Sequence, residues 1–294
     1  MTPSSNDINT LTPKWAIEYF TSAGTAFGLA IKEKLHEEQS PFQKIEIFET
    51  ETFGKLMMLD GCMMVSDKDN FLYHEMIVHP ALFSHACPKS VVVIGGGDCG
   101  TLKEVLKHKS VEQAFQIEID ERVTKVSEIY FPSLCSSNKD QRAQLLFLDG
   151  IKWIQDRPDE SLDIILIDST DPVGPAAGLF KTDFYKECFR ALKKGGIFAQ
   201  QSESPLLHVS TIIKEMHENM AAVGFTSSQT LPFPQPIYPS GWWSITLAGK
   251  EHDVKSFREE AVTAKTFTSN YYNVETHKAS LAMPDFFKPF LLRK

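Results

Sequence analysis

Four acidic residues that follow short apolar runs are the part of this sequence most suited to chemistry: Asp98, Glu118, Asp149 and Asp168. A second carboxylate, Asp171, follows three residues after the last of them. Carboxylates accept hydrogen bonds from hydroxyls and amines, pair with cations and accept protons. Their grouping predicts a site for a ligand that carries hydroxyl and amino groups.

The first of these acids lies in a glycine-rich segment, Gly95-Gly96-Gly97-Asp98-Cys99-Gly100. The segment satisfies G-x-G-x-x-G between an expected strand and an expected helix that starts at Thr101. Glu118 follows at about the distance expected of a ribose-binding acid. These features predict a nucleoside-type cofactor, and a turn with glycines for steric reasons alone is the less favoured alternative.

Asp98 discriminates between kinds of nucleoside. In a dinucleotide site, the N-terminus of this helix must accept a pyrophosphate. A carboxylate about 4 Å from a phosphate would cost about 4 kcal/mol at an effective dielectric of 20. The segment therefore favours a cationic cofactor, and a sulfonium such as that of S-adenosylmethionine fits.

The next two acids also fit a nucleoside. Glu118 has two oxygens that can accept hydrogen bonds from both ribose hydroxyls. Asp149 can reach the exocyclic amine of adenine, and Gly150 lets the ring approach the backbone. Each acid alone is more often a solvated loop residue, but three acids in register with three strand ends favour a binding site.

The fourth acid opens the segment Asp168-Ser169-Thr170-Asp171-Pro172-Val173-Gly174-Pro175. Two carboxylates three residues apart in a Pro/Gly loop can hold a cation between them. A turn in which Asp168 caps Thr170 and Pro172 fixes Asp171 explains the segment about equally well by itself. Because the segment would face the glycine-rich segment, we favour a functional role.

The pattern of apolar runs predicts the scaffold that positions these acids. Short apolar strands alternate with helical stretches of about 10 to 15 residues, which is typical of a parallel sheet covered by helices on both faces. In such sheets ligands bind outside the carboxyl ends of the strands, where the acids lie. The expected strands are 91–94, 114–119, 144–148, 162–167 and 196–200, with a last β segment at 243–248.

The first part of the chain has a different pattern. Residues 42–66 contain apolar alternation and the pair Asp60-Gly61, a strong hairpin signal. We expect a small antiparallel β domain here, preceded by a polar N-terminal segment that includes Trp15. An amphipathic helix capped by Asp69 then opens the α/β part. The expected domains are residues 1–68 and 69–294.

Composition sets the class of protein. The 294 residues, of which 42% are hydrophobic, are ample for a packed core. The net charge of −8 disfavours a nucleic-acid partner, and no apolar run approaches the ~20 residues of a membrane helix. The five cysteines have no metal-ligand spacing, and the first residues lack the basic start and apolar stretch of a secretory signal. We expect a cytoplasmic protein without disulfides, bound metal or membrane partner.

Several of these segments together resemble the spermidine synthases, the polyamine aminopropyltransferases. They are Leu59-Asp60-Gly61, DKDNFLYHEM from Asp67, GGGDCGTLKE from Gly95, DSTDPVGPAAGLF from Asp168 and YPSG from Tyr238. The combination of GGGDxG with DSTDPxGP is highly specific, and the likeness covers nearly the whole chain. It implies a Rossmann-like, methyltransferase-type catalytic domain, a small N-terminal β domain, and homodimers or homotetramers.

The resemblance also implies a reaction and its residues. The aminopropyl group of decarboxylated S-adenosylmethionine would pass to putrescine, giving spermidine and methylthioadenosine, with no prosthetic group. Asp168 would accept the proton, and residues 169–180 would form a lid. The implied nucleoside-binding residues are Gln43, Gly95, Gly96, Gly97, Asp98, Glu118, Asp149, Gly150 and Pro175. The implied polyamine-binding residues are Trp15, Tyr73, His74, Asp98, Asp168, Ser169, Thr170, Asp171, Gln201 and Tyr238.

The implied chemistry makes physical demands on these residues. An alkyl amine with a pKa of about 10.4 is protonated at pH 7, and removing that proton costs about 4 to 5 kcal/mol. An aspartate with a pKa of ~3.9 is too weak a base to do this in water, so desolvation or onward release of the proton must help Asp168. Tyr73 and Tyr238 could fix its orientation, and Asp171 is the better candidate for a distal ammonium.

Four features depart from the family pattern: Met64 in place of Gln, Cys99 in place of Gly or Ala, Asn70 in place of Glu, and Trp242-Trp243 after YPSG. Met64 removes a polar group near the amine channel. The acceptor therefore remains open among putrescine, cadaverine, agmatine and spermidine.

Three other functions fit parts of the pattern. An S-adenosylmethionine methyltransferase is the nearest, but Asp98 beside Asp168 would repel the carboxylate of that cofactor. An NAD-dependent oxidoreductase is disfavoured by Asp98 at the pyrophosphate position. A catalytically silent binding paralogue is disfavoured because all four strand-end acids are present, although Met64 keeps this alternative open.

Overall fold

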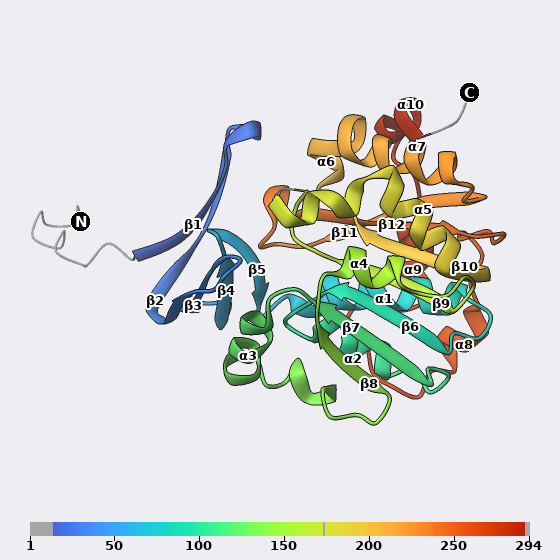
Figure 1. Cartoon of the computed structure of the whole chain (residues 1–294). Helices are drawn as coiled ribbons and strands as arrows, with labels where there is room; N and C mark the ends of the chain where they lie inside the picture. Colours follow the sequence, from blue (N-terminus) through green and yellow to red (C-terminus); the bar gives the residue numbers. More distant parts are fainter. Residues whose placement is uncertain (1–13, 173, 292–294) are drawn as a thin grey trace, which may run out of the picture. The chain divides into compact units, whose positions relative to one another are not determined.

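The computed structural model describes residues 14–172 and 174–291, with the side chain of Pro175 left out. The chain divides into two compact units, Met1–Lys68 and Asp69–Lys294 (Figure 1). Each unit has its own sheet. Among the described residues, no helix is long and apolar enough to cross a bilayer.

The described part of the first unit is a five-stranded antiparallel sheet in the order β1-β2-β3-β4-β5. The expected hairpin is confirmed, because Asp60 and Gly61 both have positive φ angles (48° and 85°) and connect paired strands. The strands are β1 (Lys14–Phe20), β2 (Thr25–Gln39), β3 (Lys44–Thr50), β4 (Lys55–Leu59) and β5 (Cys62–Ser66).

The expected polar segment around Trp15 is wrong, because this part of the chain forms strands β1 and β2. The alternation in β1 is inverted relative to an ordinary surface strand. Trp15, Ile17 and Tyr19 are exposed by 54%, 38% and 70%, whereas Glu18 is buried and accepts a hydrogen bond from the Met63 N–H at 2.9 Å. The polar residue therefore faces the sheet interior, and a pattern rule that places apolar residues inside could not assign the strand.

The second unit contains a seven-stranded sheet in the order β11-β12-β10-β9-β6-β7-β8. Strands β10, β9, β6, β7 and β8 run parallel, whereas β12 pairs antiparallel with β10 and β11 pairs antiparallel with β12 at one edge. The fold class is confirmed as α/β with a mainly parallel sheet. The strands are β6 (Ser90–Gly95), β7 (Gln113–Glu118), β8 (Ala143–Phe147), β9 (Leu162–Asp168), β10 (Leu192–Gln201), β11 (Ser227–Pro234) and β12 (Trp242–Gly249).

Strand β11 was not expected from the sequence. It contains Pro232 and Pro234, which lack the N–H needed inside a sheet. The strand lies at the edge, next to β12 alone, where prolines are tolerated. The edge position, which a single sequence does not reveal, resolves the apparent conflict.

Helices cover both faces of this sheet. Along β6, Val91 and Val93 pack in one core with α1 and α2, whereas Val92 and Ile94 pack in a second core with α4, α5 and α7. The helices are α1 (Asn70–Ser84), α2 (Gly100–Leu106), α3 (Glu121–Tyr130), α4 (Gly150–Gln155), α5 (Thr182–Ala191), α6 (Pro205–His208), α7 (Lys214–Val223), α8 (Glu259–Thr263), α9 (Val274–Ser280) and α10 (Lys288–Leu291).

Helix α1 is not amphipathic, contrary to the expectation. Every residue from Tyr73 to Ser84 is buried, because the C-terminal part of the chain covers the helix. The Glu75 carboxylate accepts three backbone hydrogen bonds, from the N–H groups of Asn270, Tyr271 and Tyr272, at 2.7 to 2.8 Å. Asp69 precedes the helix but makes no capping bond, since its carboxylate accepts from the Ile237 N–H at 3.2 Å.

The strand order reverses between β6 and β9, which are sequence-distant neighbours. At their carboxyl ends the backbones come into close contact, and the Gly96 N–H donates to the Asp168 carbonyl oxygen at 2.8 Å. Gly95 has a φ of +83°, and a Cβ added there would lie 2.1 Å from the same carbonyl oxygen. Only glycine satisfies both conditions, and open α/β sheets bind ligands at such reversal points.

We expect Gly95→Ala to lower the free energy of unfolding by about 3 kcal/mol or more, because it adds a backbone clash to an unfavourable φ. Gly195→Ala is a matched control, since Gly195 has a φ of +77° and nothing within 4 Å of an added Cβ. Gly195→Ala should lower the free energy of unfolding only by the cost of a non-glycine residue at positive φ, about 1 to 2 kcal/mol. Urea unfolding measures both, and equal losses would contradict the close contact at Gly95.

Candidate active site

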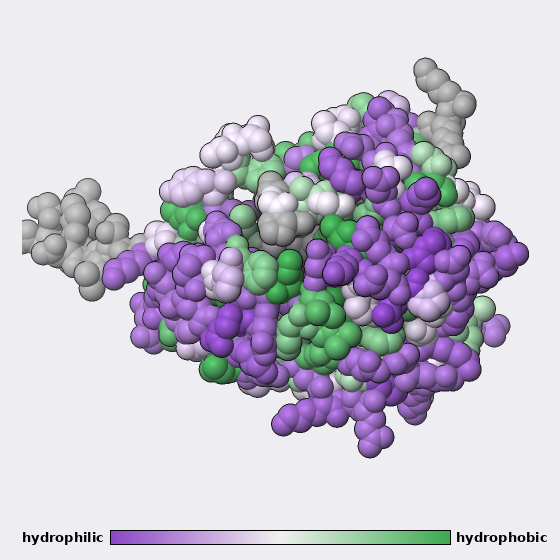
Figure 2. Space-filling model, in the orientation of Figure 1, coloured by the Kyte–Doolittle hydropathy of each residue, from purple (hydrophilic) through white to green (hydrophobic). Residues whose placement is uncertain are grey.

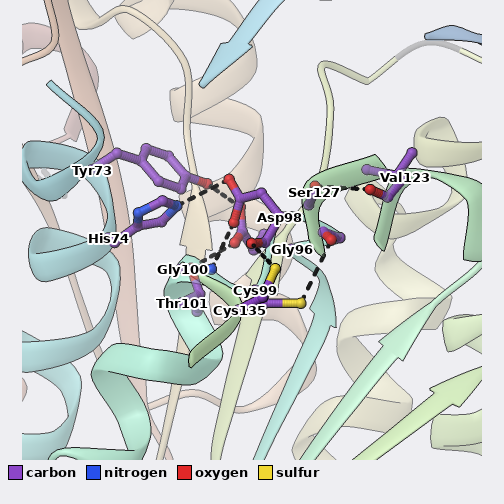
Figure 3. A network of polar contacts seen from close by, with 12 residues as sticks. Tyr73, His74, Gly96, Asp98, Cys99, Gly100, Thr101, Val123, Ser127 and Cys135 are labelled. Carbon is purple, nitrogen blue, oxygen red and sulfur yellow. Dashed lines mark hydrogen bonds and ion pairs between the residues drawn. The ribbon is translucent and has the colours of Figure 1, made fainter. Parts of the chain in front are cut away.

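Asp168, the last residue of β9, accepts hydrogen bonds from two hydroxyl groups. The Tyr73 hydroxyl of α1 donates to Oδ1 at 2.7 Å, and the Thr101 hydroxyl of α2 donates to Oδ2 at 2.6 Å (Figure 3). Burial raises the pKa of Asp168, and the negative charge of Asp98 adds to this effect. The proposed turn in which Asp168 caps Thr170 is therefore disfavoured, because both carboxylate oxygens face the helices.

Asp98 forms an ion pair with a buried histidine. His74 Nε2 lies 3.1 Å from Asp98 Oδ2, and the Gly100 N–H donates to Oδ1 at 2.7 Å. Burial disfavours the charged form of both residues. The favourable interactions of the charged forms, chiefly with each other, are larger in sum, so that the pKa of Asp98 is lowered and the pKa of His74 is raised. Asp98 thus accepts a hydrogen bond from the first residue of α2 and also directs one oxygen toward the histidine.

Gly100 makes this ion pair possible. A Cβ added at Gly100 would lie 2.2 Å from the His74 ring, so the imidazole sits directly against the first residue of α2. Figure 3 shows Tyr73 and His74 extending from the same helix toward the loop that carries Asp98. Two neighbouring residues of α1 therefore reach two different carboxylates.

Glu118, the last residue of β7, is a buried acid that forms no ion pair with any residue the structure describes. Its Oε1 accepts the Asp120 N–H at 2.8 Å. Burial raises its pKa from 4.5 to about 7. A Cβ added at Gly97 would lie 2.9 Å from Oε2, which places the glycine-rich segment directly beside this carboxylate.

Asp149 has a structural role that the sequence did not predict. It follows β8 and caps α4, with Oδ1 accepting from the N–H groups of Ile151 (2.8 Å) and Lys152 (3.4 Å). Gly150 also has a packing reason, because an added Cβ would lie 2.4 Å from Ile94 Cγ2. These contacts leave Oδ2 of Asp149 out of the capping bonds.

Apolar side chains surround the ends of these strands. Figure 2 shows hydrophobic side chains gathered near the middle of one face of the molecule. Ile119 and Leu148 are exposed by 37% and 50%. Each follows its strand directly, next to Glu118 and Asp149 respectively. An apolar surface bordered by carboxylates suits a flat ring that carries amino and hydroxyl groups.

The loop after β9 contacts the end of β10. Ser169 donates to the Thr170 carbonyl at 3.0 Å, and the Gln201 amide donates to the same carbonyl at 3.3 Å. The Tyr238 ring packs edge-on against Tyr73, with the ring centroids 5.8 Å apart. Tyr73 and Tyr238 therefore lie together near Asp168, and Gln201 holds the loop that follows it.

Two residues of this region were missed by the sequence analysis, Thr101 and Glu203. Glu203 is buried and has a φ of +65°, and burial raises the pKa of the nearby Asp171 more strongly than Glu203 lowers it. Its only signal was an acid two residues beyond Gln201. Thr101 lies in the quoted segment GGGDCGTLKE, but it was given no role in the site, because a threonine in the first turn of a helix is common.

The remaining predicted residues have other positions. Trp15 lies on β1, and Gln43 lies between β2 and β3, where its N–H donates to Ser40 Oγ at 3.0 Å. Both belong to the first unit. Pro175 lies in a 3₁₀ segment, Gly174–Phe180, and its side chain is outside the described residues. In the described part of the chain, no group of three or more His, Cys, Asp or Glu side chains could hold a metal ion.

The sequence was compared with known families and proteins. The spermine/spermidine synthase domain matches residues 70–258. The chain belongs to the spermine/spermidine synthase family. A spermidine synthase tetramerisation domain matches residues 14–67. Polyamine aminopropyltransferases of Methylococcus capsulatus and Thioalkalivibrio sulfidiphilus are 58% and 60% identical, over 93% and 90% of this chain and 95% and 93% of their own.

Solved structures of spermidine synthases also match. One is a complex with the transition-state analogue AdoDATO, with a TM-score of 0.91 and 37% identity over 96% of this chain and 97% of that chain. The spermidine synthase of Thermotoga maritima has a TM-score of 0.89 and 37% identity over 96% of each chain. The predicted family and the predicted enzyme class, an alkyl-group transferase, are confirmed.

We expect the buried carboxyl group of Glu118 to make the free energy of unfolding of this spermidine synthase family protein depend on pH. The unfolded chain releases the proton near pH 4.5 and the folded chain near pH 7, so stability falls between these values by about 3 kcal/mol. Glu118→Gln removes the ionisation but keeps an oxygen for the Asp120 N–H. In urea unfolding without ligand, the free energy of unfolding of Glu118→Gln minus that of the wild type should therefore increase as pH rises from 5 to 8.

The exposed Glu121, changed to Gln, is the control and should show no such growing difference. A Glu118→Gln variant that tracks the wild type at every pH would mean that the carboxylate ionises without penalty in the folded protein.

Proposed function

We propose that this chain transfers the aminopropyl group of decarboxylated S-adenosylmethionine to putrescine, giving spermidine and methylthioadenosine. The observation that carries the proposal is the hydrogen-bonded network around Asp168 and Asp98, two carboxylates at the point where the strand order reverses. The names of the relatives and the AdoDATO complex of a structural neighbour support it.

The donor's nucleoside would bind at the ends of β7 and β8. Glu118 would accept from the ribose hydroxyls and Asp149 from the adenine amine through Oδ2, with Ile119 and Leu148 against the ring. Binding a ribose would also supply the buried Glu118 with hydroxyl donors that favour its charged form. Gly95, Gly96, Gly97, Gly150 and Pro175 would complete this site.

Asp98 would select the donor. Its carboxylate is kept charged by His74, and it suits the terminal ammonium of a decarboxylated donor. Ordinary S-adenosylmethionine carries a carboxylate that Asp98 would repel. The methyltransferase alternative is disfavoured for this reason.

Asp168 would accept the proton of the attacking amine. The amine nitrogen forms a bond to the donor's methylene carbon, the carbon–sulfur bond breaks with its electron pair going to sulfur, and the amine proton passes to Asp168. Because the sulfonium already activates this carbon, positioning supplies much of the catalysis. The raised pKa of Asp168 makes it a stronger base than an exposed aspartate.

The acceptor amine would lie between this carboxylate and the loop after β9. Tyr73, Gln201 and Tyr238 border Asp168, while Asp171 would hold the distal ammonium. His74, Ser169 and Thr170 complete the candidate residues of the second unit. Putrescine is the proposed acceptor because two carboxylates suit its two amines.

We further infer that the chain self-associates and acts in the cytoplasm. A tetramerisation domain matches the first unit, and Trp15, Ile17 and Tyr19 form an exposed apolar stripe on β1. An apolar stripe of this kind is typical of subunit interfaces. The five cysteines are all free thiols, which suits a reducing compartment. A homodimer or homotetramer is the proposed state.

We expect Asp168→Asn to lower kcat with decarboxylated S-adenosylmethionine and putrescine by a factor of ~10² to 10⁴, because the amide keeps the shape but cannot accept the proton. Calorimetry should show that the variant still binds methylthioadenosine. Glu118→Gln is the complementary variant and should lose nucleoside affinity instead, by about 1.5 to 3 kcal/mol. Turnover of Asp168→Asn within a few-fold of the wild type would remove Asp168 from this role.

We expect the wild type to bind decarboxylated S-adenosylmethionine more than about a hundredfold better than S-adenosylmethionine. Like charges ~4 to 5 Å apart repel by roughly 3 to 4 kcal/mol at an effective dielectric near 20. Asp98→Asn should narrow this ratio by weakening the first donor and relieving the repulsion of the second. Competition binding of the two donors to the wild type and to Asp98→Asn measures this affinity ratio. Equal affinities in the wild type, or a ratio unchanged by the mutation, would favour a methyltransferase.

A further inference from the structure

The Asp168 carboxylate has a second hydroxyl donor, to which the sequence analysis gave no role. Thr101 is completely buried in the second position of α2, and its hydroxyl lies 2.6 Å from Asp168 Oδ2 (Figure 3). This is the short distance typical of a hydroxyl that donates to a charged oxygen. Tyr73 occupies the other oxygen, so one donor comes from each of the two helices that border the site.

The hydroxyl of Thr101 has few other partners. A helical threonine can otherwise donate to the carbonyl of an earlier residue, here Gly97, four positions before it. That carbonyl already accepts from Thr124 Oγ1 at 3.0 Å and from Cys99 Sγ at 3.6 Å. A β-branched side chain in a helix is also restricted in χ1. The Thr101 hydroxyl is therefore directed to Asp168 by its surroundings.

We propose that Thr101 is a positioning residue for the reaction: its hydroxyl fixes Oδ2 of Asp168 and keeps the carboxylate deprotonated and ready to accept the amine proton. The inference rests on the proposed function in one respect, the assignment of Asp168 as the proton acceptor.

The charged and titratable groups around Asp168 show why this hydrogen bond matters. Burial and the charge of Asp98 favour the protonated acid, whereas His74 and the hydroxyls of Thr101 and Tyr73 favour the carboxylate. Tyr238 and Glu118 also face it: burial and the charge of Asp168 raise the pKa of Tyr238, and the charge of Asp168 adds to the raised pKa of Glu118. Removing one stabilising hydroxyl therefore shifts the balance toward the protonated acid.

The matched pair Thr101→Val and Thr101→Ser tests the proposal. Valine has nearly the shape of threonine without the hydroxyl, and serine keeps the hydroxyl. In Thr101→Val, the acid limb of the pH profile of kcat/KM should move up by about one to two pH units, the worth of a hydrogen bond to a charged group. Thr101→Ser should keep the wild-type acid limb. If the valine variant does not fold, Thr101→Ala should give the same shift.

A second readout does not depend on turnover. The ¹³C-carboxyl resonance of Asp168, assigned by its loss in Asp168→Asn, should titrate at higher pH in Thr101→Val than in the wild type. A titration shift without aminopropyl transfer in any variant would uphold the role of Thr101 and overturn the proposed function. The inference would be overturned if the wild type transfers the aminopropyl group but neither the acid limb nor the Asp168 resonance shifts in Thr101→Val. It would also be overturned if Thr101→Ser shifts as far as Thr101→Val.

Discussion

The hydrogen bond from the Gly96 N–H to the carbonyl of Asp168 is the contact on which the site depends. It joins the carboxyl ends of β6 and β9, and it forms because Gly95 presents no side chain to that carbonyl. The contact fixes two loops that are far apart in sequence, one with Asp98 and one with Asp168. Two buried carboxylates would repel each other in this arrangement, which requires compensation from neighbouring groups.

The compensation comes from the two helices next to the sheet. His74 supplies a positive charge to Asp98, and Tyr73 and Thr101 supply hydroxyls to Asp168. Each glycine near these contacts has a steric reason: Gly100 makes room for the imidazole, and Gly97 for the Glu118 carboxylate. Glu118 is the exception, because no ion pair with a described residue offsets the burial that raises its pKa. A ligand with hydroxyl donors would favour its charged form.

The sequence allowed the central strands and most of the acids to be predicted, because apolar runs identify buried parallel strands and acids at their ends share one sheet edge. It did not reveal β11, whose prolines are compatible only with an edge, or β1, whose buried Glu18 inverts the usual alternation. It also did not reveal what the side chains bond. Asp149 proved to be a helix cap, and Thr101 a partner of Asp168, because such contacts depend on which residues distant in sequence become neighbours.

The burial of α1 has a consequence for how the protein is made. Glu75, on the helix that carries Tyr73 and His74, is satisfied by backbone groups that lie 195 to 197 residues later in the chain. During synthesis from the N-terminus, these backbone partners are therefore absent until residues 270–272 have been made. The helix that bears Tyr73 and His74 therefore reaches its final environment only after this segment exists. The site depends in this way on a segment that contributes none of its proposed residues.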